Sequence, residues 1–154
     1  MTHFSIAVDI QAPPGRVWAV LRDIEHWPEW TPTVTSIQRV DRSPLTLGSR
    51  ARIRQPKLLP AEWQVSELEE GRSFTWVSRS PGVRVTARHG VEATQGGSQP
   101  TLSLQFSGLL GPLVARLTRS LSERYLALEA RGLKERIEGA MPSPSASHES
   151  APAN

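Results

Sequence analysis

The chain of 154 residues contains no cysteine. This absence excludes disulfides, thiolate metal sites and a cysteine nucleophile, while leaving the redox compartment open. No apolar run approaches the ~18 residues needed to cross a membrane, so we expect no integral membrane association. The first ten residues lack the basic start and apolar core of a signal peptide. We therefore expect a cytoplasmic protein.

Several functional motifs are also missing. The sequence has no Gly-x-Ser-x-Gly elbow, no phosphate-binding Gly-x-x-x-x-Gly-Lys and no dinucleotide-binding Gly-x-Gly-x-x-Gly. His3, His26 and His148 fall in no spacing that binds zinc. These absences disfavour serine hydrolysis and nucleotide chemistry, and they predict no metal and no cofactor.

Charge of one sign is not concentrated anywhere. Eighteen Lys and Arg face fifteen Asp and Glu, and sixteen of the eighteen cations are arginine. The arginines are dispersed, whereas a nucleic-acid binder clusters its cations among aromatic residues. We therefore predict no nucleic-acid partner.

What the sequence does contain is a regular pattern of strands and turns. Residues 2–11 alternate between apolar and polar, as in a half-buried strand. A short helix follows the two prolines at 13 and 14, and Pro28 and Pro32 limit the next one. Further strands are predicted at 34–41, 49–55, from 61 to the turn at 69–71, at 74–78, at 83–92 and around 102–106. Seven strands at hairpin spacing favour an antiparallel sheet.

The last predicted element is a long helix. After Gly111 and Pro112 the chain runs to Glu138 without proline, with apolar residues recurring at threes and fours. At ~1.5 Å per residue this helix would span about 40 Å, so its apolar stripe must lie against a sheet. We predict one domain over residues 2–138 and a disordered tail over 139–154, where large apolar residues are nearly absent.

This order of elements resembles the START-like superfamily, in particular its polyketide cyclase/dehydrase and lipid-transport group, also called SRPBCC proteins. The segments that carry the resemblance are APPGRVW at 12–18, DIEHWPEW at 23–30, LGS at 47–49, FTW at 74–76, RHGVE at 88–92 and GLK at 132–134. The resemblance implies an α+β helix-grip fold: a seven-stranded curved antiparallel sheet around one long C-terminal helix, with two short helices after the first strand.

A sheet that curls around a helix leaves a gap, and an apolar gap is the usual form of a small-molecule site. We therefore expect a small hydrophobic ligand as the partner of this chain, which would be a monomer or a weak homodimer. Inward strand parity and the inner stripe of the long helix predict eight ligand-binding residues: Ile53, Trp63, Trp76, His89, Leu104, Leu117, Leu121 and Tyr125. Trp30 is added because the resemblance implies that the proline-broken second helix borders the mouth of the pocket.

His89 is the one candidate catalytic residue. It shares a strand face with Val85, Ala87 and Val91, so it interrupts an apolar, inward-facing row. It is either a core histidine satisfied by a hydrogen bond or a cavity-lining donor, acceptor or general base. Tyr125 likewise either packs in the core or contacts the ligand.

Two charged features are expected to face solvent. Glu67 continues the inward parity of Trp63 and Val65, but the adjacent turn favours a solvated carboxylate. An inward Glu67 would instead have a raised pKa and could exchange protons with a histidine. The alternating Arg50, Arg52 and Arg54 predict an exposed convex face rather than a site for an anionic membrane.

Three functions remain open from the sequence. The favoured one is binding or transport of a lipid, a polyketide-like molecule or an aromatic metabolite, because few polar residues have inward parity. The second is a cyclase, dehydratase or isomerase that uses His89 as acid and base. The third is a protein-interaction module whose pocket is vestigial.

Overall fold

The computed structural model describes residues 2–41 and 44–139. Seven strands form one antiparallel sheet in the order β1-β7-β6-β5-β4-β3-β2. The strands are β1 (Thr2–Ala7), β2 (Ser36–Arg39), β3 (Arg50–Arg54), β4 (Ala61–Glu69), β5 (Ser73–Ser80), β6 (Val83–Thr94) and β7 (Gly97–Ser107). The helices are α1 (Pro14–Arg22), the 3-10 helix η1 (Ile24–Glu29), α2 (Gly111–Leu117) and α3 (Arg119–Gly139).

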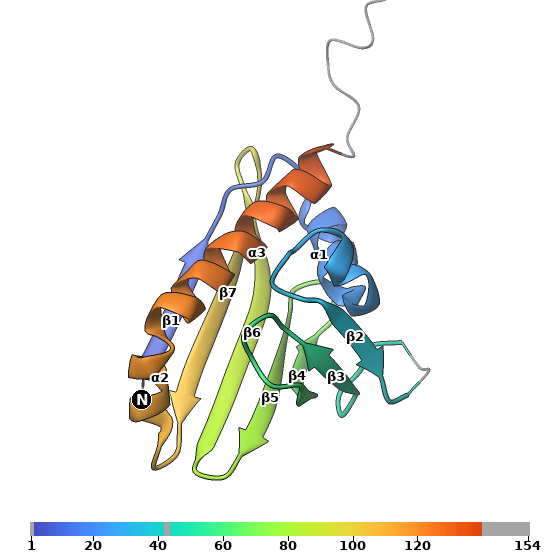
Figure 1. Ribbon diagram of the computed structural model, residues 1–154. Coiled ribbons are helices and arrows are strands. Elements are labelled where there is room, and N and C mark those ends of the chain that lie inside the picture. Colours follow the sequence, from blue (N-terminus) through green and yellow to red (C-terminus); the bar gives the residue numbers. More distant parts are fainter. Residues whose placement is uncertain (1, 42–43, 140–154) are drawn as a thin grey trace, which may run out of the picture.

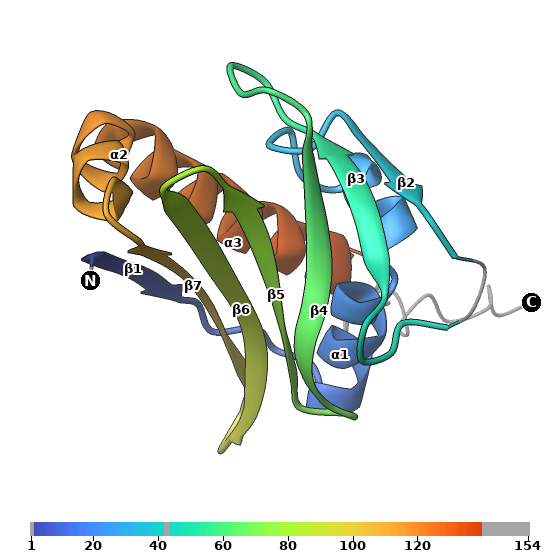
Figure 2. The ribbon, with the colours of Figure 1, turned by 90° about the horizontal axis from the view of Figure 1, so that it is seen from below.

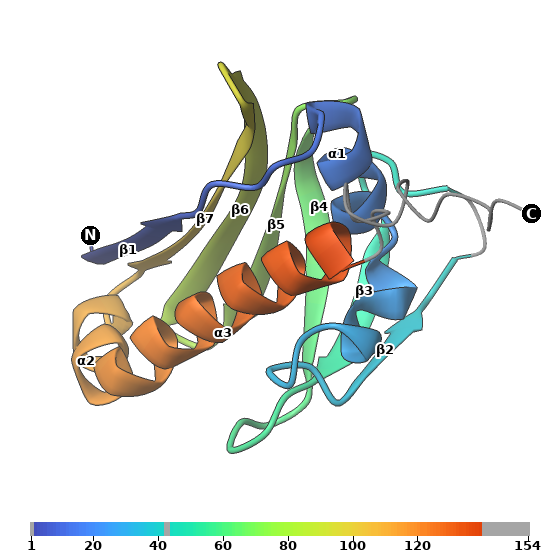
Figure 3. The ribbon, with the colours of Figure 1, turned by 90° about the horizontal axis from the view of Figure 1, so that it is seen from above.

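The sheet curls around α3, which crosses its concave face (Figures 1, 2 and 3). The edge strands β1 and β2 are joined by α1 and η1, which cover one end of the sheet (Figure 1). The predicted helix-grip architecture, with two short helices after the first strand, is therefore confirmed. Strand β1 is shorter than predicted, although Ile10 still forms a bridge to Ser98 of β7.

The predicted C-terminal helix is divided in two at Thr118. Thr118 leaves the helical backbone conformation, with φ −104° and ψ 11°. Its hydroxyl donates to the carbonyl oxygen of Val114 at 2.7 Å, a local bond that competes with regular helix geometry. The seven residues of α2 therefore run in a different direction from α3 (Figure 3).

The two halves of α3 have different surroundings. In its C-terminal half, Leu133 and Ile137 are fully buried in the core together with Val17 and Leu21 of α1. In its N-terminal half, Leu121 is only half-buried. The C-terminal half of α3 thus packs on the core, while its N-terminal half lies over a space between the helix and the concave face of the sheet. Gly139 ends α3, and the rest of the predicted tail lies outside the described residues.

Candidate ligand-binding cavity

A cavity of about 510 Å³ lies between the concave face of the sheet and helices α2 and α3. Its lining is mainly apolar and aromatic, and its strand residues come from β3, β4, β5, β6 and β7. The sheet contributes Ile53, Ala61, Trp63, Trp76, Ser78, Ser80, Val85, Ala87, His89, Leu102, Ser103, Leu104 and Phe106. Val114, Thr118, Leu121, Ser122, Tyr125, Leu126 and Glu129 line it from the helices, Gln55, Lys57, Leu58 and Leu59 from the β3–β4 loop, and Trp27 and Val34 from the segment before β2.

A second depression of about 620 Å³ lies between the edge strand β1 and the outer side of α2 and α3. It is larger, but Arg116, Arg119 and Glu123 line it, and Arg119 and Glu123 are paired with each other at 3.3 Å. The cavity under α3 is the better candidate because its aromatic lining suits an apolar guest.

Seven of the nine residues predicted to contact a ligand line this cavity. They are Ile53, Trp63, Trp76, His89, Leu104, Leu121 and Tyr125. The five strand residues among them lie on the concave face of the sheet, toward the cavity.

Trp30 does not line the cavity. It packs against Trp27, with ring centroids 5.6 Å apart, and lies against α3 at Gly132. Its place is one layer behind the cavity wall, because the turn of η1 directs Trp27 rather than Trp30 toward the sheet. Trp27, not Trp30, is the tryptophan of this segment that reaches the cavity.

Leu117 is also outside the lining, and 76% of it is exposed. Its predicted place on the inner stripe depends on one continuous helix. The change of direction at Thr118 shifts the face that α2 presents, so that Val114 and Thr118 line the cavity instead.

His89 lies in an aromatic box. Its ring stacks on Phe74 at 4.8 Å with an interplanar angle of 14°, and the rings of Trp27 and Trp76 lie 4.9 Å and 5.9 Å away. Burial, with a smaller contribution from the positive charge of Arg88, lowers the pKa of His89 to about 3. The imidazole is therefore neutral at physiological pH.

The hydrogen-bonding state of His89 departs from that of a satisfied core histidine. Its Nδ1 is buried and has no hydrogen-bond partner among the described residues, and the same is true of Nε1 of Trp63. Leaving a buried polar atom unpaired costs about 1–3 kcal/mol, and both of these rings belong to side chains that line the cavity.

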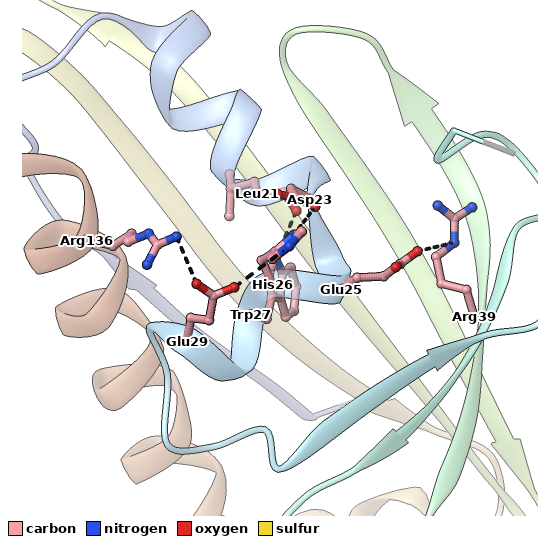
Figure 4. Close-up of polar contacts among 8 residues, drawn as sticks. All are labelled: Leu21, Asp23, Glu25, His26, Trp27, Glu29, Arg39 and Arg136. Carbon is pink, nitrogen blue, oxygen red and sulfur yellow. Dashed lines mark hydrogen bonds and ion pairs between the residues drawn. The ribbon is translucent and has the colours of Figure 1, made fainter. Parts of the chain in front are cut away.

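Polar contacts fix the position of η1, the 3-10 helix that carries Trp27 (Figure 4). Nε1 of Trp27 donates to the carbonyl oxygen of Leu21 at 3.1 Å. Glu29 contacts Arg136 of α3 at 3.4 Å, and Glu25 contacts Arg39 of β2 at 3.8 Å. The 3-10 helix is thus tied to three neighbouring elements, which fixes one wall of the cavity.

Glu129 is a polar cavity residue that the sequence reasoning missed. Its Oε1 accepts a hydrogen bond of 3.1 Å from the hydroxyl of Thr33, which itself lies 2.9 Å from the hydroxyl of Thr31. Both threonines are 1% exposed. Glu129 retains some exposed area because it faces the cavity, but the surrounding protein removes most of the bulk water. Burial raises the pKa of Glu129 to about 7, although the hydrogen bond from Thr33 acts to lower it.

The position of Glu129 in the cavity wall could have been inferred from its spacing along the helix. It lies four residues after Tyr125 and eight after Leu121, both of which line the cavity. An acidic residue at this spacing is more typical of the polar edge of an apolar stripe. Tyr125, on the same stripe, donates its hydroxyl hydrogen to the carbonyl oxygen of Pro56, so it links α3 to the β3–β4 loop.

The charged residues expected to face solvent do so. Glu67 is exposed because a bulge between Val65 and Glu67 shifts the register of β4 against β5 and reverses the inward parity. Arg50, Arg52 and Arg54 are exposed on β3. A proton-transfer pair of Glu67 and His89 is therefore ruled out by position.

Within residues 2–41 and 44–139 there is no group of three or more side chains placed to hold a metal ion. In the same part of the chain, no helix is long and apolar enough to cross a membrane.

Two of the described histidines have pKa values shifted in opposite directions from the ordinary value. Hydrogen bonding to Asp23, and then its negative charge, raises the pKa of His26, whereas the pKa of His89 is lowered to about 3. In an imidazole ¹⁵N NMR titration we expect His26 to protonate above its ordinary pKa and His89 to stay neutral down to about pH 4. Protonation of His89 near pH 6.5 would show that its ring is hydrated rather than enclosed.

Comparison with solved structures supports the fold. Protein TTHA0849 from Thermus thermophilus is similar at a TM-score of 0.73 and 20% identity, over 92% of this chain and 100% of that one. The Zhui aromatase/cyclase from Streptomyces sp. R1128 is similar at a TM-score of 0.72 and 15% identity, over 89% and 93% of the two chains. Protein MLL2253 from Mesorhizobium loti gives 0.70 and 15%, over 92% and 100%. At these identities the likeness extends to the fold alone.

At the sequence level, no curated protein matches the chain. The profile of one family does match, over residues 1–138, and its description is polyketide cyclase / dehydrase and lipid transport. That match spans every strand and all but the last residue of α3. The chain therefore belongs to the polyketide cyclase/dehydrase and lipid transport family.

Proposed function

We propose that this protein binds a small, mainly apolar molecule that carries at least one hydrogen-bonding group, in the cavity under α3. The observation that carries this proposal is the 510 Å³ cavity, lined by tryptophans, aliphatic residues and a few polar groups. Its volume falls within the ~300–1,000 Å³ typical of small-molecule sites. Release of water from the apolar wall would drive binding.

The polar groups of the wall would orient the ligand. Glu129 offers a carboxyl group that is held by Thr33 and can either accept or donate a hydrogen bond near neutral pH. His89 and Trp63 each hold a ring nitrogen without a partner among the described residues. A ligand with one hydroxyl or carbonyl group within an apolar frame would satisfy such a wall.

Native mass spectrometry of freshly purified protein tests the proposal directly. A co-purifying molecule that is released on denaturation supports it. A clean apo mass, together with no fluorescence response of the uncharged dye N-phenyl-1-naphthylamine, would contradict it and favour the protein-interaction module with a vestigial pocket.

Filling the cavity should weaken binding. Ala87 lies at its floor, between Trp76 of β5 and Leu104 of β7, and is only 4% exposed. We expect Ala87→Phe to weaken dye binding at least ~10-fold, because the ring occupies the space of the guest. Fluorescence titration measures the affinity, and circular dichroism checks the fold.

The matched control is Ala127→Phe, which adds the same ring to the exposed side of α3. This variant should bind the dye as the wild type does. Equal affinity of both variants would place the dye, and the proposed site, elsewhere on the molecule.

A second candidate function is acid–base catalysis on the bound molecule, and Glu129 is the observation that favours it. A carboxyl group whose pKa is about 7 can both take up and release a proton at physiological pH. His89 is a weaker candidate than the sequence suggested, because burial lowers its pKa to about 3. Adding the extracted molecule back to apo protein and following its chromatographic retention tests for turnover, with Glu129→Gln as the inactive control.

A further inference from the structure

The exposed apolar residues of this protein are unevenly distributed. Of the eight large hydrophobic side chains that are exposed among the described residues, six belong to two segments beside the cavity. They are Leu58 and Leu59 of the β3–β4 loop, and Leu109, Leu110, Leu113 and Leu117 in and just before α2. Leu109 is 98% exposed and Leu59 is 87% exposed, so neither is covered by the rest of the chain.

These segments surround the opening of the cavity. Leu58 and Leu59 line it from one side, and Val114 and Thr118 line it from the other. The amide nitrogen of Leu110 donates to the carbonyl oxygen of Gly82 at 2.9 Å, which joins the start of α2 to the β5–β6 turn. Figure 2 shows the β3–β4 loop, the β5–β6 turn and α2 at the same end of the molecule, away from α1. We call residues 54–60, 78–86 and 107–122 the mouth segments.

The mouth segments also carry charge of one sign only. They contain six cations, namely Arg54, Lys57, Arg79, Arg84, Arg116 and Arg119, and no aspartate or glutamate. The rest of the chain has twelve cations against fifteen carboxylates. Glu123, just beyond these segments, pairs with Arg119, and the other five cations have no acidic residue within the mouth segments to neutralise them.

We propose that the mouth segments dock peripherally on an anionic lipid bilayer, where the exposed leucines enter the boundary between headgroups and acyl chains. Exposed leucines flanked by arginines suit this boundary, because the apolar side chains leave water while the cations meet acidic headgroups. The cavity opening would then face the bilayer. Resting on the proposed function, this placement lets an apolar ligand pass between bilayer and cavity without crossing water.

A bilayer fits this surface better than an acidic protein does. The exposed leucines are divided between two separate segments, the β3–β4 loop and the start of α2, rather than gathered on one element. A protein bound across both sets would cap the cavity. A bilayer instead supplies a continuous apolar phase in which the proposed ligand itself dissolves.

The test is flotation of the full chain with vesicles of phosphatidylcholine alone and of phosphatidylcholine mixed with phosphatidylglycerol. We expect binding to the mixed vesicles that weakens as salt is added. The double variant Leu113→Gln/Leu117→Gln should bind at least ~10-fold more weakly, because two inserted side chains become polar. Its matched control is Val40→Gln/Leu47→Gln, which removes the two exposed large hydrophobic side chains that the described residues carry outside the mouth segments and should bind as the wild type does.

The charge contribution has its own pair of variants. Arg79→Gln/Arg84→Gln removes two mouth cations that face each other across β5 and β6, whereas Arg50→Gln/Arg52→Gln removes two exposed cations of β3. Only the first pair should reduce binding to the mixed vesicles. The proposal is overturned if the protein binds neither kind of vesicle, or if the mouth and control variants lose binding equally. It is also overturned if the protein binds an acidic protein but no vesicles.

Dye binding without vesicles separates this proposal from the proposed function. Leu113→Gln/Leu117→Gln should keep the wild-type affinity for N-phenyl-1-naphthylamine, because neither leucine lines the cavity. If the wild type binds vesicles but not the dye, docking stands and the ligand-binding proposal fails.

Discussion

Replacing Gly132 by alanine is expected to destabilise the domain by about 3 kcal/mol, because overpacking at a rigid contact displaces whole elements. A Cβ at this position would lie 2.0 Å from the carbonyl oxygen of Trp30 and 3.1 Å from its carbonyl carbon. Both atoms belong to the backbone, so neither can rotate away, and α3 must move off the segment after η1. The normal gain of alanine over glycine in a helix, about 1 kcal/mol, is too small to offset this overlap.

Urea unfolding followed by circular dichroism measures the loss. The matched control is Gly139→Ala at the end of the same helix, where an added Cβ would meet no atom within 4 Å. This variant should be as stable as the wild type or slightly more stable. If Gly132→Ala also keeps the wild-type stability, the close approach of α3 to Trp30 is wrong. Because Glu129 lies one turn before Gly132, the shifted helix should also weaken dye binding.

Gly132 illustrates how the sequence could indicate a feature without explaining it. The GLK segment at 132–134 carried part of the resemblance to the family. The structure supplies the physical reason: Gly132 admits the backbone of Trp30, and Nζ of Lys134 donates to the carbonyl oxygen of Asp9 at 2.5 Å. Leu133, between them, is fully buried. These three residues fix α3 against both the segment after β1 and the segment after η1.

The fold was predictable because most of its elements follow simple periodicity. Alternation in β1 and β6 marked the inward faces, and the absence of internal proline marked the long helix. Periodicity misleads where a local interaction overrides it. The hydroxyl of Thr118 interrupts the helix, and the bulge at Val65–Glu67 changes the parity of β4. A periodic pattern is judged over several turns or strand residues, so it shows neither the effect of one threonine on a helix nor the effect of one extra residue in a strand.

The candidate site was predictable on the sheet and less so on the helices. Strand parity identified Trp63, Trp76 and His89, since successive strand residues must face opposite sides. Glu129 was missed because its inward position depends on a partner, Thr33, that lies 96 residues away in the sequence. A carboxyl group is expected at the surface unless such a tertiary contact accommodates it.

His89 and Glu129 should affect stability in opposite directions as the pH changes. The folded-state pKa of His89, about 3, is below its ordinary value of 6.5, so the unfolded chain binds the proton first on acidification. Stability contributed by His89 therefore falls as the pH drops from 6.5 toward 3. The folded-state pKa of Glu129, about 7, is above its ordinary value of 4.5, so its contribution falls as the pH rises from 4.5 toward 7. Between pH 4.5 and 6.5 the two slopes oppose each other.

Removing either group should expose the slope of the other. For a full difference of one proton the slope is about 1.4 kcal/mol per pH unit. Relative to the wild type, Glu129→Gln should lose stability on acidification from pH 6.5 to 4.5, because only the His89 contribution remains. His89→Leu should gain stability over the same interval, because only the Glu129 contribution remains. Over the two units each change amounts to at most about 2.7 kcal/mol.

Urea unfolding of the three proteins at about pH 4.5, 5.5 and 6.5 measures these differences, and other carboxylates cancel because each variant is compared with the wild type at the same pH. His26→Gln serves as a control at about pH 4.5 and 5.5. His26 is exposed and does not line the cavity, and its raised pKa leaves it protonated in both the folded and the unfolded chain at these pH values. Two variant curves that run parallel to the wild type would mean that both side chains titrate as if hydrated. In that case water fills the cavity and hydrates the side chains that line it, and the dry, apolar environment on which ligand binding depends is absent. Opposite slopes would instead place a buried imidazole and a buried carboxyl group in one water-poor space, which is the environment that an apolar ligand with a single polar group requires.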